Sequence, residues 1–200
     1  MLTKHELLEP LAELRREEIV VATMAAVRPW GRLSEHELDF ASADSAMGHA
    51  ADLALGLALA QPLRKVICLN GDGSMLMSLG TLTTIIESGV SNLILFVLVN
   101  GTYEITGNQR IPARGSLDWG GLASSSGFKR VYRFYESNDY KKALSGILRS
   151  GGSSFVEVQV EPGGEGPISR SEKEKAEYLK ISLAESAHDL RRALVGENKL

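Results

Sequence analysis

Short apolar runs alternate along the chain with longer segments in which apolar residues recur at helical spacing. The runs predict strands at 19–22, 65–69, 93–99, 130–135 and 155–160. The longer segments predict helices at 4–16, 47–60, 79–88, 118–126 and 139–149, with loops at 28–32 and 100–117. Strands that alternate with helices favour a mainly parallel sheet covered on both faces. We therefore predict an α/β fold with three α/β/α layers.

The chain beyond the last predicted strand has a different character. Residues 163–167 (Gly-Gly-Glu-Gly-Pro) interrupt the pattern, and residues 171–194 predict a charged terminal helix that packs its leucines on the domain. We expect residues 1–165 to form one domain and residues 166–200 to be a helical extension of it. The pattern assigns no role to this extension.

The composition is that of an ordinary globular protein, with 44% hydrophobic and 24% charged residues in a chain of 200. A net charge of −3 gives no support for binding to nucleic acid or to a membrane surface. Cys68 is the only cysteine, which excludes a disulfide within the chain and an iron–sulfur cluster held by this chain alone. No apolar run reaches membrane-spanning length and no secretory signal is visible, so we expect a cytoplasmic protein.

Two polar clusters directly follow two of the predicted strands. Asn70-Gly71-Asp72-Gly73-Ser74 follows the strand at 65–69, and Asn100-Gly101 follows the strand at 93–99. Ligands of open parallel sheets bind at the carboxyl ends of the strands. The glycines allow main-chain N–H groups to approach a phosphate, and Asp72 and Asn100 supply the oxygen donors that Mg²⁺ prefers. The two clusters therefore predict a site for a metal-bound diphosphate.

Each cluster also has a plainer interpretation when taken alone. Asp72 is a suitable residue to cap the helix that follows it, and Asn100-Gly101 is a common hairpin turn. The long apolar strand before Asn100 and the loop after it disfavour a hairpin. Only the pairing of the two clusters makes the binding site the better interpretation.

The paired clusters resemble the diphosphate-binding motif of thiamine-diphosphate enzymes, in which Gly-Asp-Gly is followed, somewhat under thirty residues later, by Asn. Upstream, residues 45–50 (Ser-Ala-Met-Gly-His-Ala) resemble the segment that these enzymes place under the aminopyrimidine ring. Downstream, residues 100–109 resemble the loop of sulfopyruvate and phosphonopyruvate decarboxylases, and above all the separate β subunit of the former. Ile105 and Asn108 depart from the usual Ser and Gly of that loop, which leaves the substrate undetermined.

This resemblance implies a role for each matching residue. Mg²⁺ is expected on the side chains of Asp72 and Asn100 and on the main-chain carbonyl of Thr102, and Met47 is expected to be the apolar wedge that bends the cofactor. The implied cofactor-binding residues are Ser45, Met47, Gly71, Asp72, Gly73, Ser74, Asn100, Thr102, Tyr103 and Ile105. The candidate catalytic residues are Met47, Tyr103 and Glu104; for Glu104, a role in proton transfer and a plain solvent-facing position remain open.

The resemblance also implies a partner. In the family, a glutamate from a second, pyrimidine-binding domain activates the cofactor, and we expect no room for that domain in a chain that already supplies the diphosphate half. We therefore expect a separate α subunit, a hetero-oligomer, and decarboxylation of a small 2-oxo acid with thiamine diphosphate and Mg²⁺. The alternatives are the β subunit of a carboligase such as acetolactate synthase, the β subunit of a 2-oxoacid oxidoreductase, and a non-catalytic cofactor-binding subunit.

Overall fold

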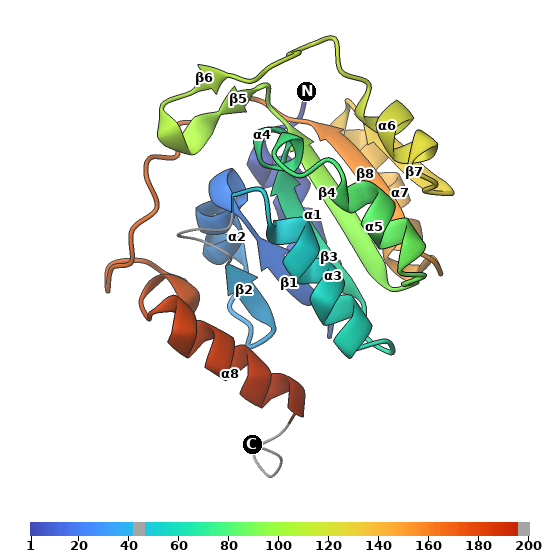
Figure 1. Ribbon diagram of the computed structural model, residues 1–200. Coiled ribbons are helices and arrows are strands. Elements are labelled where there is room, and N and C mark those ends of the chain that lie inside the picture. Colours follow the sequence, from blue (N-terminus) through green and yellow to red (C-terminus); the bar gives the residue numbers. More distant parts are fainter. Residues whose placement is uncertain (42–46, 196–200) are drawn as a thin grey trace.

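The computed structural model of the chain describes residues 1–41 and 47–195. Its centre is a six-stranded sheet in which all neighbouring strands run parallel, in the order β2-β1-β3-β4-β8-β7 (Figure 1). The strands are β1 (Ile19–Ala22), β2 (Asp39–Ala41), β3 (Val66–Gly71), β4 (Leu93–Val99), β7 (Arg130–Phe134) and β8 (Ser154–Gln159). The predicted mainly parallel sheet is confirmed.

Helices cover both faces of the sheet. One face carries α1 (Lys4–Leu14), α2 (Val27–Leu33) and α7 (Ser137–Arg149), and the other carries α3 (Ala50–Ala60), α5 (Thr81–Glu87) and α6 (Trp119–Ser125). Successive residues of β1 alternate between the two cores, with Val20 and Ala22 in the first and Ile19 and Val21 in the second. Strands β1, β3 and β4 are therefore buried on both faces, which explains their continuous apolar sequences, whereas the edge strand β7 is partly exposed.

The prediction of a loop at 28–32 is wrong, because these residues form most of α2. Pro29 lies in the first turn of this helix, where a missing N–H removes no intrahelical hydrogen bond. Strand β2 was not predicted either. It has only three residues, too few for a pattern of alternation, and it lies at the edge of the sheet.

The region of the two polar clusters contains short elements that the hydrophobic pattern did not predict. Helix α4 (Asp72–Leu76) begins at the end of β3, and a 3₁₀ turn, η1 (Met24–Ala26), follows β1. Within the predicted loop at 100–117, β5 (Thr102–Tyr103) and β6 (Gln109–Arg110) form a small antiparallel ribbon around the 3₁₀ turn η2 (Glu104–Thr106).

The C-terminal helix is shorter than predicted. A 3₁₀ turn, η3 (Glu177–Leu179), precedes α8, which spans Leu183–Val195. The helix begins there because Ser182 and Glu185 form a reciprocal cap, in which the N–H of each residue donates to the side chain of the other. Leu190 is buried against the domain, as expected.

The boundary between a domain at residues 1–165 and an extension at residues 166–200 stays a prediction. None of the helices in the described residues has the length and apolar character that a membrane crossing requires.

Candidate functional site

The two polar clusters meet at the carboxyl edge of the sheet. Strands β3 and β4 are neighbours, with Gly71 opposite Leu98. The Gly101 N–H, from the second cluster, donates a 2.7 Å hydrogen bond to Asp72 Oδ2, from the first. The other carboxylate oxygen, Oδ1, accepts a 2.8 Å bond from the Gly73 N–H. Asp72 therefore joins the clusters directly. It is the first residue of α4 and not its cap, because the N-cap is Gly71 and the helix has no side-chain cap hydrogen bond.

Burial makes the charge of Asp72 costly. The side chain is only 1% exposed, and this desolvation raises its pKa to about 6, against the opposing effect of the N–H groups of Gly101 and Gly73. A cation beside the carboxylate would relieve this cost, because an opposite charge favours the ionised form.

Asn100 has both ends of its side-chain amide engaged. Its Oδ1 accepts a 2.9 Å bond from the Thr102 N–H, and its Nδ2 donates a 3.0 Å bond to Glu104 Oε2. Asp72, Asn100 and Thr102 line the same pocket. They offer one carboxylate, one carboxamide and one main-chain carbonyl. The described residues contain no group of three or more His, Cys, Asp or Glu side chains that could hold a metal ion. A mixed oxygen set of this kind fits Mg²⁺ better than Zn²⁺.

The pocket has a volume of about 40 Å³. Sites that enclose a whole small molecule usually have about 300 Å³ or more, so the pocket of this chain holds only part of a cofactor-sized ligand. Besides Lys4, Leu98 and Val160, its lining comprises residues 23–26 at the end of β1, Met47, residues 71–74, Asn100, and residues 102–106. Every predicted cofactor-binding residue in the described part of the chain therefore lies on one pocket.

Gly73 has no space for a side chain. A Cβ atom at this position would lie 2.7 Å from two ring atoms of Tyr103. The glycine therefore allows the aromatic ring of the β5 loop to lie directly on the backbone at the start of α4. This close approach brings Tyr103 into the pocket beside the predicted diphosphate-binding N–H groups.

Met47 lies in the turn before α3 and lines the pocket. The next residue, Gly48, has a φ of +93°, a conformation that favours glycine. Its N–H donates a 2.9 Å bond to Ser74 Oγ, and its carbonyl accepts from Ser78 Oγ. The turn that carries the predicted wedge is thus attached to the segment after Asp72. Ser45, the other predicted contact to the aminopyrimidine, lies outside the described residues.

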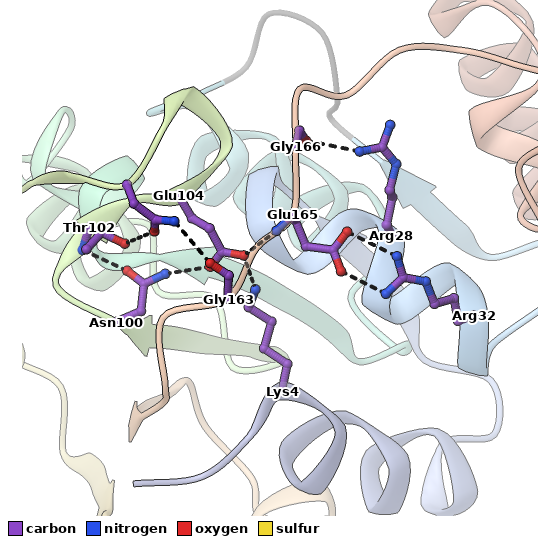
Figure 2. Close-up of polar contacts among 10 residues, drawn as sticks. Lys4, Arg28, Arg32, Asn100, Thr102, Glu104, Gly163, Glu165 and Gly166 are labelled. Carbon is purple, nitrogen blue, oxygen red and sulfur yellow. Dashed lines mark hydrogen bonds and ion pairs between the residues drawn. The ribbon is translucent and has the colours of Figure 1, made fainter.

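Glu104 is buried rather than solvent-facing, with 4% exposure. Its carboxylate forms an ion pair with Lys4, accepts the bond from Asn100, and accepts a 3.1 Å bond from the Glu165 N–H (Figure 2). The carboxylate thus joins its own loop to two segments that are distant in sequence, the N-terminal helix and residue 165.

Sequence reasoning missed several residues of the site. Residues 23–26 could have been found, because they follow a predicted strand that ends at the same edge of the sheet. Lys4 and Ser78 carried no signal, since a lysine or a serine at a helical position is ordinary. Both reach the site through contacts that only the tertiary structure defines.

Two proteins that are similar in sequence cover most of this chain. A phosphonopyruvate decarboxylase of Streptomyces viridochromogenes is 34% identical over 171 residues, 85% of this chain and 42% of that protein. The β subunit of sulfopyruvate decarboxylase of Methanothermobacter thermautotrophicus is 35% identical over 164 residues, 82% of this chain and 84% of that subunit. The chain thus spans less than half of the first relative and most of the second.

Solved structures share the fold. The thiamine diphosphate-dependent 4-hydroxybenzoylformate decarboxylase of Rhodococcus jostii superposes with a TM-score of 0.67 at 20% identity, over 82% of this chain and 33% of that one. Residues 22–158 match the family described as "Thiamine pyrophosphate enzyme, C-terminal TPP binding domain". This match covers both polar clusters and the loop between β4 and α6. The chain belongs to the family of thiamine pyrophosphate enzymes and contains their C-terminal, cofactor-binding domain.

Proposed function

We propose that this chain is the diphosphate-binding β subunit of a two-subunit, Mg²⁺-dependent decarboxylase that converts a 2-oxo acid into an aldehyde and CO₂. The observation that carries the proposal is the contact of the Gly101 N–H with Asp72, which brings both halves of the family motif into one pocket. The similarity to a sulfopyruvate decarboxylase β subunit over 84% of its length supports the two-subunit arrangement.

In this proposal, Mg²⁺ is held by the side-chain oxygens of Asp72 and Asn100 and by the carbonyl of Thr102. The main-chain N–H groups of Gly73, Ser74 and Ile105 bind the diphosphate, next to Gly71 at the end of β3. Met47 supports the bent cofactor. Ser45 is assigned to the aminopyrimidine edge. When bound, thiamine diphosphate supplies the thiazolium that takes up the electron pair released as the 2-oxo acid loses CO₂.

The residues of this chain then position the substrate and deliver a proton to the carbon atom that was the keto carbon of the 2-oxo acid. Tyr103 and Glu104 are the candidates for proton transfer. The Tyr103 ring lies against Gly73 in the pocket, whereas both oxygens of Glu104 are hydrogen-bonded. Tyr103→Phe removes only the hydroxyl, so a fall in kcat with an unchanged KM for cofactor would assign the proton to Tyr103.

A partner subunit is proposed to supply the activating glutamate and the rest of the cofactor site. The small volume of the pocket agrees with a site completed by another chain. Helix α3 also exposes large apolar side chains, Leu53 at 36% and Leu59 at 55%, and Leu63 follows it fully exposed. Exposed large apolar side chains are found at protein interfaces. A cytoplasmic location stays a prediction.

The test is to purify the chain together with a partner that carries a pyrimidine-binding domain. Sulfopyruvate, phosphonopyruvate and pyruvate are then assayed with thiamine diphosphate and Mg²⁺ for release of CO₂ and aldehyde. We expect activity in the complex and none in the isolated chain. Asp72→Ala should lower kcat/KM by at least about 100-fold. Asp189→Ala, which removes an exposed carboxylate paired with Arg192 on α8, is the matched control.

The result separates the alternatives. Full activity in the Asp72→Ala complex would show a non-catalytic role for this site. A product that joins two carbonyl compounds would indicate a carboligase. Activity only with an electron acceptor would indicate an oxidoreductase.

A further inference from the structure

The contacts of Glu104 determine how the side-chain amide of Asn100 is oriented. An ionised carboxylate only accepts hydrogen bonds, so it selects the NH₂ end of the amide. The Asn100 Nδ2 accordingly donates to Glu104 Oε2, and Oδ1 lies on the other side, within 2.9 Å of the Thr102 nitrogen. If the amide rotated by 180°, its oxygen would face the Glu104 carboxylate and its NH₂ group would face the Thr102 N–H. Both contacts would be repulsive.

Lys4 makes this buried carboxylate tolerable. Glu104 is almost fully buried, and its charge would be costly without a partner. The Lys4 ammonium, from the first turn of α1, forms an ion pair with Glu104 Oε1, and the Lys4 side chain is itself only 11% exposed. The Glu165 N–H donates to the same oxygen. Oε2 therefore remains available for Asn100.

Residues 163–167, here called the strap, lie beside the ion pair of Glu104 and Lys4 (Figure 2). Asn108 Nδ2 donates a 3.1 Å bond to the Gly163 carbonyl, and Asn108 Oδ1 accepts one from Thr102 Oγ1. A Cβ atom on Gly163 would lie 2.6 Å from Glu104 Oε1. The strap thus lies directly against the ion pair and against the loop that carries Asn100 and Thr102.

The far end of the strap is attached to α2. Arg32 forms a double ion pair with the Glu165 side chain, at 2.7 and 3.1 Å. Arg28 donates to the carbonyls of Gly166 and Pro167 and pairs with Glu174. These contacts are independent of Glu104, so they hold the strap in place when the Glu104 side chain is changed.

We propose that Glu104, paired with Lys4 and backed by the strap, is a positioning residue that holds the Asn100 oxygen toward the Mg²⁺ of the cofactor. The proposal rests on the proposed function, since it concerns the same metal site. It assigns the N-terminal helix and the strap a part in cofactor binding, although both lie outside the matched residues 22–158. Groups that orient metal ligands typically change metal affinity by about 10- to 100-fold when they are mutated.

Glu104→Gln is the principal test. Glutamine keeps the shape of the side chain, but one of its two polar ends is a donor. With its oxygen toward Lys4 and Glu165, its NH₂ group faces Asn100 and favours the rotated amide. Thiamine diphosphate bound to the full chain is measured by equilibrium dialysis across a series of Mg²⁺ concentrations. We expect the Mg²⁺ midpoint to rise about tenfold or more.

A double variant separates positioning from stability. Glu104→Gln leaves the Lys4 charge buried without its partner, and this also lowers the melting temperature. Lys4→Met combined with Glu104→Gln removes both charges, so we expect the melting temperature to recover while the raised Mg²⁺ midpoint persists. Glu177→Gln is the matched control, because it changes a carboxylate that pairs with Lys180 and belongs to neither the strap nor the loop.

Each outcome decides a different question. An unchanged Mg²⁺ midpoint in Glu104→Gln, or a midpoint that returns to the wild-type value in the double variant, overturns the positioning role and leaves the proposed function intact. If the wild-type chain shows no Mg²⁺-dependent binding of thiamine diphosphate, either alone or with its partner, the proposed function fails and the positioning role fails with it.

Discussion

The buried carboxylate of Asp72 predicts an unusual pH dependence of stability in the metal-free chain. Its pKa is about 6 in the folded chain, against 3.8 for an ordinary aspartate. Between these values the folded state binds a proton that the unfolded state has lost. The free energy of unfolding contributed by this group therefore rises as the pH falls from 7 to 4. This is the opposite of the usual behaviour of a carboxylate with a lowered pKa.

The size of the effect follows from the two pKa values. Each unit of difference corresponds to about 1.4 kcal/mol, and most of the window lies between pH 7 and pH 4. Over this range Asp72 should add about 2 to 3 kcal/mol to the free energy of unfolding. Asp72→Asn is neutral at every pH and lacks this contribution. It also loses one acceptor for the N–H groups of Gly73 and Gly101, a loss that does not depend on pH.

The assay is urea unfolding of the wild-type chain and of Asp72→Asn in EDTA, at several pH values from 7 to 4. Taking the difference between the two proteins cancels the titration of all other groups. We expect this difference to shift in favour of the wild type as the pH falls. Mg²⁺ with thiamine diphosphate should oppose the shift, because a cation favours ionised Asp72. A difference that stays constant, or that moves against the wild type, would refute the assignment of a costly buried charge.

Three further predictions test other parts of the structure. Gly73→Ala should displace the Tyr103 ring and lower the free energy of unfolding by about 1 to 3 kcal/mol. Adding Tyr103→Ala to the same chain should recover much of the lost melting temperature. An unchanged melting temperature in Gly73→Ala would contradict the contact. Ser182→Ala removes the cap of α8 and should lower the free energy of unfolding by about 1 kcal/mol in urea titrations, whereas no loss would show that the cap contributes nothing. The Cys68 thiol is fully buried, and this burial raises its pKa, so it should react with a disulfide reagent only after unfolding; prompt reaction in the native chain would place it at the surface.

The sheet and the location of the site could be predicted from the sequence because both depend on local signals. Strands buried on two faces require continuous apolar runs, and those at 65–69 and 93–99 are continuous enough to be recognised. The polar clusters follow directly, and the carboxyl ends of neighbouring parallel strands must lie together. The sequence thus predicted the shared edge of the sheet, and the contact between Asp72 and Gly101 follows from the adjacency of β3 and β4, which the structure shows.

The elements that were missed or misplaced depend on weaker or more distant signals. The residues of β2 are too few to show alternation, and α2 contains Pro29, which suggests a loop unless its place in the first turn is known. Residues 171–182 have a helix-like composition, but the cap formed by Ser182 and Glu185 starts the helix later. A cap of this kind is visible in the sequence, and giving it more weight would have corrected the boundary.

Asn108 shows how a departure from a family pattern can be understood only in three dimensions. Its φ of +61° lies in the left-handed region, which glycine adopts freely and in which asparagine is among the best tolerated alternatives. The family pattern that the loop resembles has glycine at this position. The backbone path is therefore kept, while the side chain adds bonds to Thr102 and Gly163 that glycine could not form. The substitution strengthens the attachment of the strap to the metal loop. At this position, then, the departure from the motif connects the proposed metal site to the C-terminal part of the chain, in addition to the bond that Glu104 accepts from the Glu165 N–H.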